Sequence, residues 1–359
     1  MERSRFLAFI NQQHRTGKTA LDDCAERGHK DSLKMLLGHG ASFSLRGNAG
    51  KNSLNWAAAG GHLEVMTVLL DIAREKCGNQ RQFQEFLDNR NVDGRTPLME
   101  AAAGNKMTIV QRLLDYGADY TIGNKLDITP LHDASWRGFY EIATAIVNKG
   151  SECLNHERFN ELLNRPNEQG KTPLIDASET GRTRIVKLLL ESGADYTIQS
   201  NNGATALHWA AFRDKIDVVR TILEEASTRS SKTDANPEEE AKSFNSFINH
   251  QAHPNKATAL RDAASQGYAN IVKLFLAYGA DYDCYDRANR SPLHYAVDRR
   301  NWDMVVALMD HVQKDLDKPK IKRFLTAKVR EGDEPVWETA KKRGSPEVAK
   351  ALDPMLALL

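Results

Sequence analysis

Apolar residues along this chain return in pairs of short helical patterns that are separated by polar turns. The stretch from Gly170 to Asn202 shows the pattern most clearly. Its first segment, TPLIDASE, places small and apolar residues on one face before Gly181. Its second segment, RIVKLLLES, has apolar residues at helical spacing and ends at Gly193, a residue type that closes helices. The pattern predicts two short helices joined by a tight turn, and therefore an all-α fold.

The unit recurs nine times, and each copy is marked by the residue that precedes its first helix. These residues are Thr19, Asn52, Thr96, Thr129, Thr172, Thr205, Thr258, Ser291 and Glu334. The steps between neighbours are 33, 44, 33, 43, 33, 53, 33 and 43 residues. A threonine at this position caps a helix, because its oxygen accepts a hydrogen bond from an amide that has no partner within the helix. The proline that follows in several copies suits the first helical position.

The 33-residue step and the motifs TPLME at 96, TPLHD at 129, TALHW at 205 and SPLHY at 291 resemble the ankyrin repeat. The resemblance covers nearly the whole chain. It implies an ankyrin-repeat solenoid of helix-turn-helix-hairpin units, in which each unit buries its apolar stripe against its neighbours. It also implies that the histidines of the T-P-L-H position (His132, His208 and His294) hydrogen-bond the neighbouring turn and are structural.

Every second unit is 10, 11 or 20 residues longer than 33, and the added residues share one apolar pattern. The pattern occurs as Phe83-x-x-Phe86-Leu87, Phe159-x-x-Leu162-Leu163, Phe244-x-x-Phe247-Ile248 and Ile321-x-x-Phe324-Leu325, and also near the start of the chain as Phe6-x-x-Phe9-Ile10. Apolar residues at i, i+3 and i+4 form one face of a short helix. We therefore predict an extra helix after alternate repeats. Its place stays open between the convex back, lengthened second helices and a rim, with the fingertip side preferred.

We predict a single array over residues 1–359. Its segments are an N-terminal capping helix (1–16), repeats 1, 3, 5 and 7 (17–49, 94–126, 170–202 and 256–288), long repeats 2, 4, 6 and 8 (50–93, 127–169, 203–255 and 289–331), and a degenerate C-terminal capping repeat (332–359). Residues 227–241, STRSSKTDANPEEEA, are polar and lack apolar periodicity. They predict a flexible loop within long repeat 6.

Composition narrows the classes of partner. The 49 basic and 48 acidic side chains give a net charge of +1, so no global field favours nucleic acid or membrane. Four separated cysteines without a Cys-x-x-Cys pair argue against a metal site and favour a reducing compartment. The chain also lacks a long apolar run and the apolar core of a signal peptide. We expect an intracellular monomer, cytoplasmic and/or nuclear, with no cofactor, metal, nucleic-acid or membrane partner.

The position after the T-P-L-H histidine carries the most informative side chains. The standard units place an acid there, and three of the four long units place an aromatic residue. Since the first helices of ankyrin proteins line a concave groove, the resemblance implies a ladder of carboxylates and aromatic rings. With residues farther along the same helices, the candidate binding residues are Trp56, Glu100, Asp133, Trp136, Arg137, Asp176, Glu179, Trp209, Phe212, Arg213, Asp262 and Tyr295.

Two interpretations of this ladder stay open. In the first, acids and aromatics only pack against neighbouring repeats. In the second, the groove takes a cationic ligand, since an acid beside an aromatic face suits a Lys, an Arg or a methylated ammonium group. The basic residues that precede the first helices (Lys18, Lys51, Arg95 and Lys171) are interpreted as a solvated edge.

The resemblance implies a non-catalytic scaffold that binds a protein partner, such as a basic or extended peptide, in its concave groove. The alternative is a small-molecule-binding protein or an enzyme that uses the carboxylates and aromatics of the same groove. The sequence contains no recognised catalytic motif, and no pair of histidines has the helical spacing of a zinc protease. We therefore assign no catalytic residue.

Overall fold

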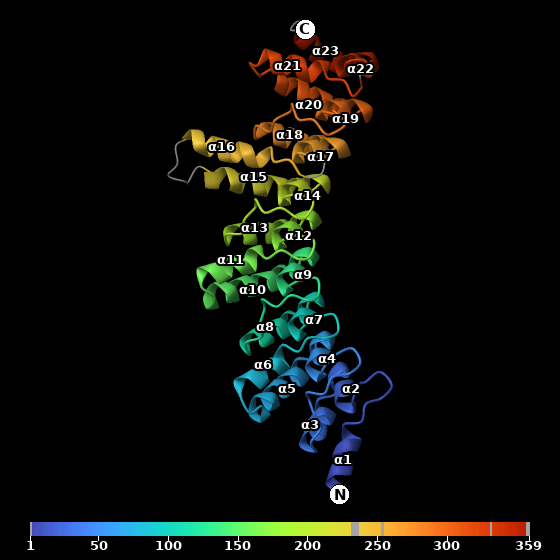
Figure 1. Cartoon of the computed structure of the whole chain (residues 1–359), viewed down its shortest axis with the longest axis vertical. Coiled ribbons are helices and arrows are strands. Elements are labelled where there is room, and N and C mark those ends of the chain that lie inside the picture. The colour runs from blue at the N-terminus through green and yellow to red at the C-terminus, as the bar shows by residue number, and fades with distance from the viewer. Residues whose placement is uncertain (1, 231–236, 253–254, 331, 357–359) are drawn as a thin grey trace. The chain divides into compact units, whose positions relative to one another are not determined.

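The computed structural model describes residues 2–230, 237–252, 255–330 and 332–356. It consists of two compact units, Met1–Gln169 and Gly170–Leu359, and the border falls where predicted repeat 5 begins. The described residues are helical and contain no strand beyond an isolated antiparallel bridge between Ala252 and Ala257. The predicted all-α class is confirmed. Within each unit, helix pairs stack on one another (Figure 1).

The first unit contains four helix pairs and three extra helices among its described residues. The first helices of the pairs are α2 (Ala20–Arg27), α4 (Ser53–Gly60), α7 (Pro97–Ala103) and α9 (Pro130–Arg137). The second helices are α3 (Lys30–Gly38), α5 (Leu63–Lys76), α8 (Met107–Asp115) and α10 (Tyr140–Cys153). The extra helices are α1 (Glu2–Ile10), α6 (Gln80–Leu87) and α11 (His156–Asn164).

The second unit contains five helix pairs and two extra helices among its described residues. The first helices are α12 (Pro173–Thr180), α14 (Ala206–Phe212), α17 (Ala259–Gln266), α19 (Pro292–Asp298) and α22 (Val336–Arg343). The second helices are α13 (Thr183–Glu191), α15 (Ile216–Ser230), α18 (Ala269–Ala277), α20 (Trp302–Val312) and α23 (Pro346–Leu356). The extra helices are α16 (Pro237–Ile248) and α21 (Lys318–Thr326).

The predicted caps fix the register of the first helices. Thr172 is the N-cap of α12, and its side chain accepts a hydrogen bond from the Ile175 amide at 3.3 Å. Gly181 closes the same helix in the left-handed region, with φ of 74°. The T-P-L-H histidine has the predicted structural role, as His208 shows. Its Nδ1 bonds the Thr205 hydroxyl at 2.9 Å and its Nε2 bonds the Ala257 carbonyl of the next repeat at 3.0 Å.

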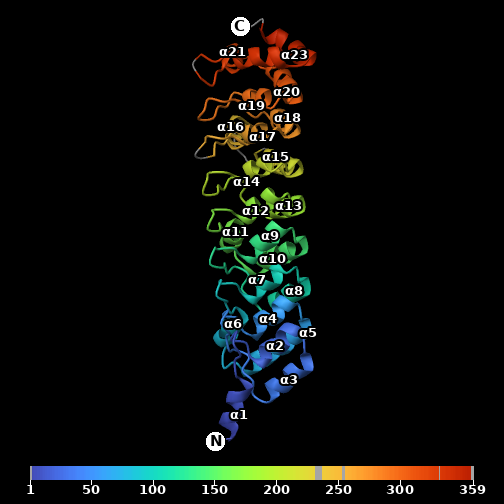
Figure 2. The same cartoon turned by 90° about the vertical axis from the view of Figure 1, so that its right-hand side faces the viewer.

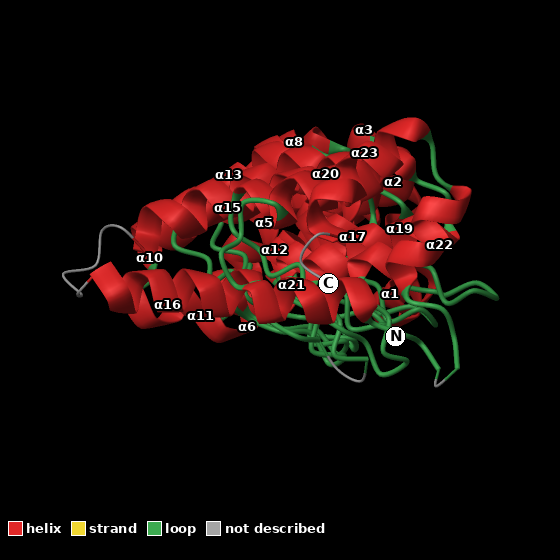
Figure 3. Ribbon diagram, turned by 90° about the horizontal axis from the view of Figure 1, so that it is seen from above, coloured by secondary structure: helices red, strands yellow, loops and turns green. Residues whose placement is uncertain are grey.

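The extra helices occur at the predicted places. The second helices that come directly before α6, α11 and α16 are longer than those of the short repeats. Helices α5 and α10 have 14 residues and α15 has 15, against 9 residues in α3, α8, α13 and α18. Three of the extra helices pack back against the second helix that precedes them, α6 on α5, α11 on α10 and α16 on α15. In the first unit, α6 and α11 lie on the side from which the loops emerge (Figures 2 and 3).

An aromatic contact links each of three double units. The Phe86 ring of α6 meets Phe43, from the loop of the preceding short repeat, edge to face with centroids 5.0 Å apart. Two further pairs repeat this contact: Phe247 with Tyr196 at 4.7 Å, and Phe324 with Tyr282 at 4.9 Å. The loop aromatic of a short repeat is thus covered by the extra helix of the long repeat that follows it. This contact gives the alternation of short and long repeats a physical reason.

The predicted loop at 227–241 is wrong at both of its ends. Residues 227–230 continue α15, and residues 237–241 begin α16, while residues 231–236 lie outside the described residues. Arg229 gives the reason for the longer α15. Its guanidinium donates hydrogen bonds to the carbonyls of Leu190, in the last turn of α13, and of Ala194, in the loop that follows, and so ties α15 to the preceding repeat.

Candidate binding face

The twelve candidate residues lie on first helices, or at the residue that ends one. In the first unit these are Trp56, Glu100, Asp133, Trp136 and Arg137, and in the second Asp176, Glu179, Trp209, Phe212, Arg213, Asp262 and Tyr295. Because the caps set a common register, the residue four positions after the cap stands at the same place in each repeat. We call these residues, within each unit, the candidate face of that unit.

In the first unit, basic residues of the chain itself contact the acidic and aromatic side chains of the candidate face. The Lys51 ammonium lies 2.9 Å from a Glu100 carboxylate oxygen and 4.7 Å from the Trp56 ring centroid. Lys18 covers the same ring at 3.7 Å. Arg95 bonds Asp133 at 2.8 Å. Each of these bases directly precedes an N-cap, so its side chain reaches the acid or ring of a first helix.

The second unit repeats the arrangement with a buried carboxylate at its centre. The Glu179 carboxylate pairs with Lys171 at 2.5 Å and with Arg213 at 2.8 Å. The same Lys171 ammonium lies 4.0 Å from the Trp209 ring centroid. Trp209 Nε1 donates to the Ser200 hydroxyl at 3.2 Å, and Asp176 is also buried. The candidate face of the second unit therefore contains a preformed network of charges.

This network corrects the interpretation of the bases before the first helices as a solvated edge. Lys18, Lys51, Arg95 and Lys171 form ion pairs with acids and lie mostly covered. Sequence reasoning missed these pairs because a single position does not show its ion-pair partner: Lys51 pairs with Glu100 of the next repeat, whereas Lys171 pairs with Glu179 of its own first helix. The signal was present, since a base directly before the cap recurs with an acid on the helix that follows.

Lys171→Met should lower the free energy of unfolding by about 1–2 kcal/mol. The substitution removes the cation from the Trp209 ring and leaves the buried Glu179 with Arg213 alone. Urea unfolding measures the change. Adding Glu179→Met to Lys171→Met should recover part of the loss, because the uncompensated buried charge is then gone. Strictly additive losses in the two variants would contradict the network.

Two aromatic residues of the face remain open to solvent. Trp136 is 45% exposed and Phe212 is 41% exposed, whereas Trp56 and Trp209 are largely covered. Both open rings stand seven residues after an N-cap threonine and are followed by a half-exposed arginine, Arg137 or Arg213. Exposed aromatic and arginine side chains are the usual anchors of protein interfaces.

A cavity of about 270 Å³ opens between α14 and α17 in the second unit. Its walls contain Trp209 and Phe212 from α14, small apolar residues from the connection to α17, and Arg261 and Asp262 from α17. This volume lies just under the range of roughly 300–1,000 Å³ that is typical of drug-sized ligand sites. The cavity therefore suits one side chain of a partner better than a large ligand.

The charges of this cavity do not balance. The buried Arg261 guanidinium bonds Asp262 at 3.1 Å and Asp286 at 3.4 Å, so one cation faces two carboxyl groups. Burial raises the pKa of Asp262 to about 6, and the neighbouring guanidinium offsets this only in part. Burial also opposes ionisation of Asp286, but hydrogen bonds outweigh it and lower the pKa of that carboxyl. One donor is the Tyr295 hydroxyl, at 2.7 Å, which ties this candidate residue to Asp286.

His208, the other titratable wall residue, is held in place. Burial lowers its pKa to about 4. Its two ring nitrogens are engaged by the Thr205 hydroxyl and by the carbonyls of His250 and Ala257. Asp262 is therefore the acid of the face that would gain most from a further cation.

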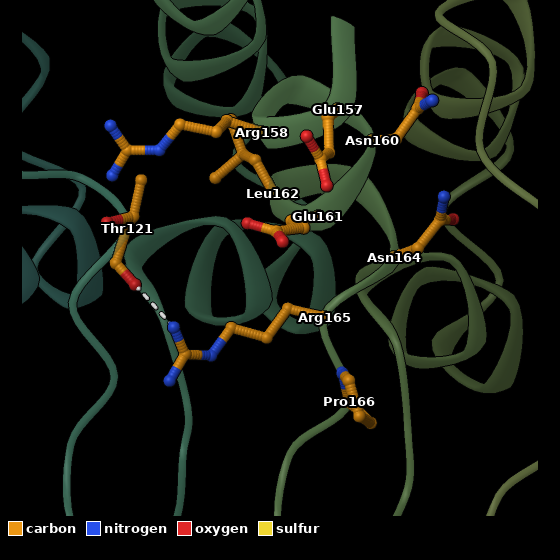
Figure 4. Close-up of a pocket in the computed structure, with 9 residues that line it drawn as sticks. All are labelled: Thr121, Glu157, Arg158, Asn160, Glu161, Leu162, Asn164, Arg165 and Pro166. Atoms are coloured by element: carbon orange, nitrogen blue, oxygen red, sulfur yellow. Dashed lines mark hydrogen bonds between the residues drawn. The ribbon is translucent and has the colours of Figure 1, made fainter. Parts of the chain in front are cut away.

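A larger cavity, of about 680 Å³, lies outside the candidate residues, on α11 (Figure 4). Alternating acidic, basic and amide side chains of α11 line it, and Arg165 donates to the Thr121 carbonyl at 3.1 Å. Its open, charge-mixed walls offer no convergent set of groups. We find no functional assignment for it.

The described residues give no sign of a metal centre or a membrane span. Within residues 2–230, 237–252, 255–330 and 332–356, no three His, Cys, Asp or Glu side chains are grouped so as to hold a metal ion. Over the same residues, no helix has both the length and the apolar character that crossing a membrane requires. All four cysteines are free thiols.

Comparison with known proteins finds ankyrin repeats along the chain. Family models described as "Ankyrin repeats (many copies)" and "Ankyrin repeats (3 copies)" match residues 21–70, 72–157, 151–234 and 235–320. The ankyrin repeat and KH domain-containing protein mask-1 of Caenorhabditis elegans is 31% identical over 73% of this chain, which spans 10% of that protein. The E3 ubiquitin-protein ligase KEG of Arabidopsis thaliana is 24% identical over 95% of this chain, which spans 22% of that protein.

Two further similarities concern a channel and a solved structure. The human transient receptor potential cation channel subfamily A member 1 is 28% identical over 60% of this chain, which spans 18% of the channel. The crystal structure of the human ASB11 ankyrin repeat domain matches with a TM-score of 0.51 and 24% identity, covering 68% of this chain and 91% of that domain. The structural match shows the fold. Since the chain spans less than a quarter of each curated relative named here, their activities belong to much longer proteins.

Proposed function

This chain belongs to the ankyrin-repeat family, and from that premise we propose that it is a protein-binding module whose second unit holds an extended basic segment of a partner. Ankyrin repeats generally mediate protein–protein interactions. The observation that carries the finer proposal is the cavity between α14 and α17, where aromatic walls meet a carboxyl group with a raised pKa. A Lys or Arg side chain of the partner is the ligand that this cavity suits best.

The charge of the cavity favours a cation. With Asp262 ionised, two carboxylates face one guanidinium, which leaves one negative charge in excess. A lysine or arginine of the partner would neutralise that charge, and its alkyl stem would pack against Phe212 and Trp209. Glu100, Asp133 and Glu179 pair with cations of the chain itself, whereas Asp262 shares the Arg261 guanidinium with Asp286, so Asp262 is the position at which a basic partner gains most.

The exposed ring and guanidinium beside the cavity add a second anchor. Phe212 is open to solvent, and Arg213 uses one of its donors on Glu179. The remaining N–H groups of Arg213 can donate hydrogen bonds to backbone carbonyls of an extended peptide. The basic residue of the partner and its backbone are therefore recognised by neighbouring groups on one helix pair.

An enzyme that uses the same groove is the less favoured alternative. A raised carboxyl pKa is typical of catalytic acid–base groups, and the raised pKa of Asp262 is the one observation that favours an enzyme. However, the nearest other titratable wall residue, His208, is fixed by hydrogen bonds on both ring nitrogens. Among the wall residues that the structure describes, the cavity thus offers a single acid–base group without a nucleophile or second proton carrier beside it.

Asp262→Asn should weaken the binding of basic peptides at least tenfold at pH 7.5, because it removes the charge that pairs with the peptide cation. The probes are pools of fluorescent nine-residue peptides with Lys, Arg, Gln, Glu or Leu at the centre, titrated against the full chain. Wild-type affinity for the Lys and Arg pools should fall about tenfold from pH 7.5 to pH 5, since a carboxyl with a pKa near 6 is then mostly protonated. The Asp262→Asn variant should show no such dependence.

Asp217→Asn is the matched control, because it removes the same charge from an exposed position on the second helix α15. It should leave all affinities unchanged. Equal losses for the Lys, Gln and Leu pools in the Asp262→Asn variant would contradict recognition of a cation. A preference of the wild type for the Glu pool would reverse the proposed charge of the partner.

A further inference from the structure

A separate cavity, of about 330 Å³, lies in the first unit between the loop that follows α3, the end of α5 and helix α6. Its walls combine two aromatic rings, Phe43 and Phe86, with two bases, Arg46 and Lys76, and with amide side chains that include Asn89. The volume is within the range of roughly 300–1,000 Å³ that is typical of small-molecule sites. A cavity that joins aromatic, basic and amide groups at this volume suits a small polar ligand.

One polar atom of the wall residues lacks a partner. The Asn89 side chain is 2% exposed, and its Nδ2 donates hydrogen bonds to the Gly50 carbonyl at 2.9 Å and to the Asn55 Oδ1 at 2.7 Å. These bonds fix the side chain. The Asn89 Oδ1 is buried and has no hydrogen-bond partner in the part of the chain that the structure describes. A ligand with an N–H group can supply the missing donor.

The two bases of the wall are not balanced by acids. Arg46 and Lys76 are exposed, and neither forms an ion pair with a described residue. The acid of the wall, Glu85, already pairs with the Arg81 guanidinium at 3.0 Å. Positive charge is therefore in excess around the cavity, which favours an anionic ligand.

The second unit shows that the repeat fold does not by itself require this arrangement. Lys76 and Arg229 stand at the same position of their long repeats. Arg229 turns back onto the preceding repeat, where it bonds two backbone carbonyls and lies with its Cζ 5.4 Å from the Tyr196 ring centroid. Phe43, the counterpart of Tyr196, instead lines the cavity together with Lys76. The base of the first unit is thus available to a ligand, whereas the base of the second unit is used by the fold.

We propose that this cavity binds a small heteroaromatic anion of the size of a nucleoside monophosphate. The phosphate of the ligand pairs with Arg46 and Lys76, since guanidinium and ammonium groups are the usual phosphate partners. The ring packs on Phe43, as nucleobases stack on aromatic side chains. An amino group of the base donates a hydrogen bond to the Asn89 Oδ1. The site belongs to the first unit, so it does not rest on the peptide cavity of the second.

Isothermal titration calorimetry of the full chain with adenosine 5′-monophosphate tests the three contacts. This nucleotide should bind at least tenfold more tightly than adenosine, inorganic phosphate or purine riboside 5′-monophosphate, which lack the phosphate, the ring and the amino group, respectively. Arg46→Gln and Lys76→Gln should each weaken its binding at least fivefold. Lys34→Gln is the matched control, because it removes the same charge from an exposed position on α3, and it should leave the affinity unchanged.

The cysteines give a second readout that needs no substitution. The Cys77 thiol lines the cavity and is partly exposed, whereas Cys153 is an exposed thiol elsewhere in the same unit. Alkylation by iodoacetamide, followed by mass spectrometry, should slow at least fivefold at Cys77 when adenosine 5′-monophosphate is saturating. The rate at Cys153 should not change.

Three results would overturn the proposal. The first is the absence of both heat and Cys77 protection with the monophosphates of adenosine, guanosine, cytidine and uridine. The second is nucleotide binding that Arg46→Gln and Lys76→Gln leave unchanged, because the nucleotide would then bind elsewhere. The third is protection of Cys77 by tryptophan but by no nucleotide, because the ligand would then be an aromatic carboxylate.

Discussion

Phe86→Ala should lower the free energy of unfolding by about 3–5 kcal/mol, the usual cost of removing a buried phenylalanine. Phe86 is 4% exposed and lies edge to face with Phe43 across two repeats. Its loss would leave a cavity between α6 and the loop of the preceding repeat. Because repeats gain most of their stability from their neighbours, the first unit should unfold at lower urea concentration.

Phe9→Ala is the matched control for this prediction. It removes the same atoms from the same register of an extra-helix pattern, but Phe9 is largely exposed. The free energy of unfolding should change by less than about 0.5 kcal/mol, as for surface positions in general. Urea unfolding followed by circular dichroism measures both variants. Similar losses in the two would show that the helix pattern itself, and not the contact with Phe43, stabilises this region.

The extra helices illustrate how much of the fold the sequence reveals. A pattern such as Phe83-x-x-Phe86-Leu87 is local, so it predicts a helix at the right residues. The residue that covers Phe86 is not near it in the sequence. Phe43 belongs to another repeat, and only the packing of α6 back on α5 brings the two rings together. The preferred fingertip side agrees with the position of α6 beside the loops, and the lengthened second helices occur as well.

The candidate face, too, could be predicted from the sequence only in part. The shared cap register allowed its residues to be placed on the first helices, since that register is fixed within a few residues of each threonine. The charges that engage them could not be assigned, because Lys51 and Arg95 bond acids of the following repeats. The excess of negative charge around Arg261 was equally hidden, since Asp286 comes from the loop that follows α18, 25 residues farther along the chain. Composition gives only the net charge of the whole chain, which is close to zero.

The predicted loop at 227–241 failed for a different reason. Polar residues without apolar periodicity do predict a loop when each side chain is judged by itself. Arg229 is polar, yet its guanidinium binds the carbonyl end of α13 and contacts the Tyr196 ring, with its Cζ 5.4 Å from the ring centroid. A polar residue with a specific partner in the preceding repeat extends a helix that composition alone would end.

Asp88→Asn should stabilise the protein by about 2–3 kcal/mol at pH 7.5. Burial raises the pKa of Asp88 to about 6, from an ordinary value of 3.8, in spite of hydrogen bonds from Gln84 and the Asp119 amide. The folded state therefore binds the proton more tightly than the unfolded state. This favours folding below about pH 4, and the advantage is lost as the pH rises through 6. A rise of about two pKa units corresponds to about 3 kcal/mol at most.

The chain itself shows that asparagine fits this position. Asn11 and Asn249 stand at the same place after α1 and α16, and each accepts a hydrogen bond from a backbone amide of the next short repeat at 2.7 Å. Asp88 accepts the equivalent bond from the Asp119 amide at 3.0 Å. Gln84, which would lose its bond to the carboxylate, keeps its bond to the Gly117 carbonyl at 3.0 Å. Asparagine thus retains the amide bond and avoids the buried charge.

Urea unfolding at pH 4.5, 6.0 and 7.5 measures the effect. The variant and the wild type should have nearly equal free energies of unfolding at pH 4.5, where the wild-type carboxyl is mostly protonated in the folded state, and should diverge as the pH rises. Asn249→Asp is the reciprocal substitution and should destabilise the second unit at pH 7.5 but much less at pH 4.5. A gain from Asp88→Asn that is the same at all three pH values would contradict the raised pKa, because the benefit would then come from packing and not from the removal of a charge.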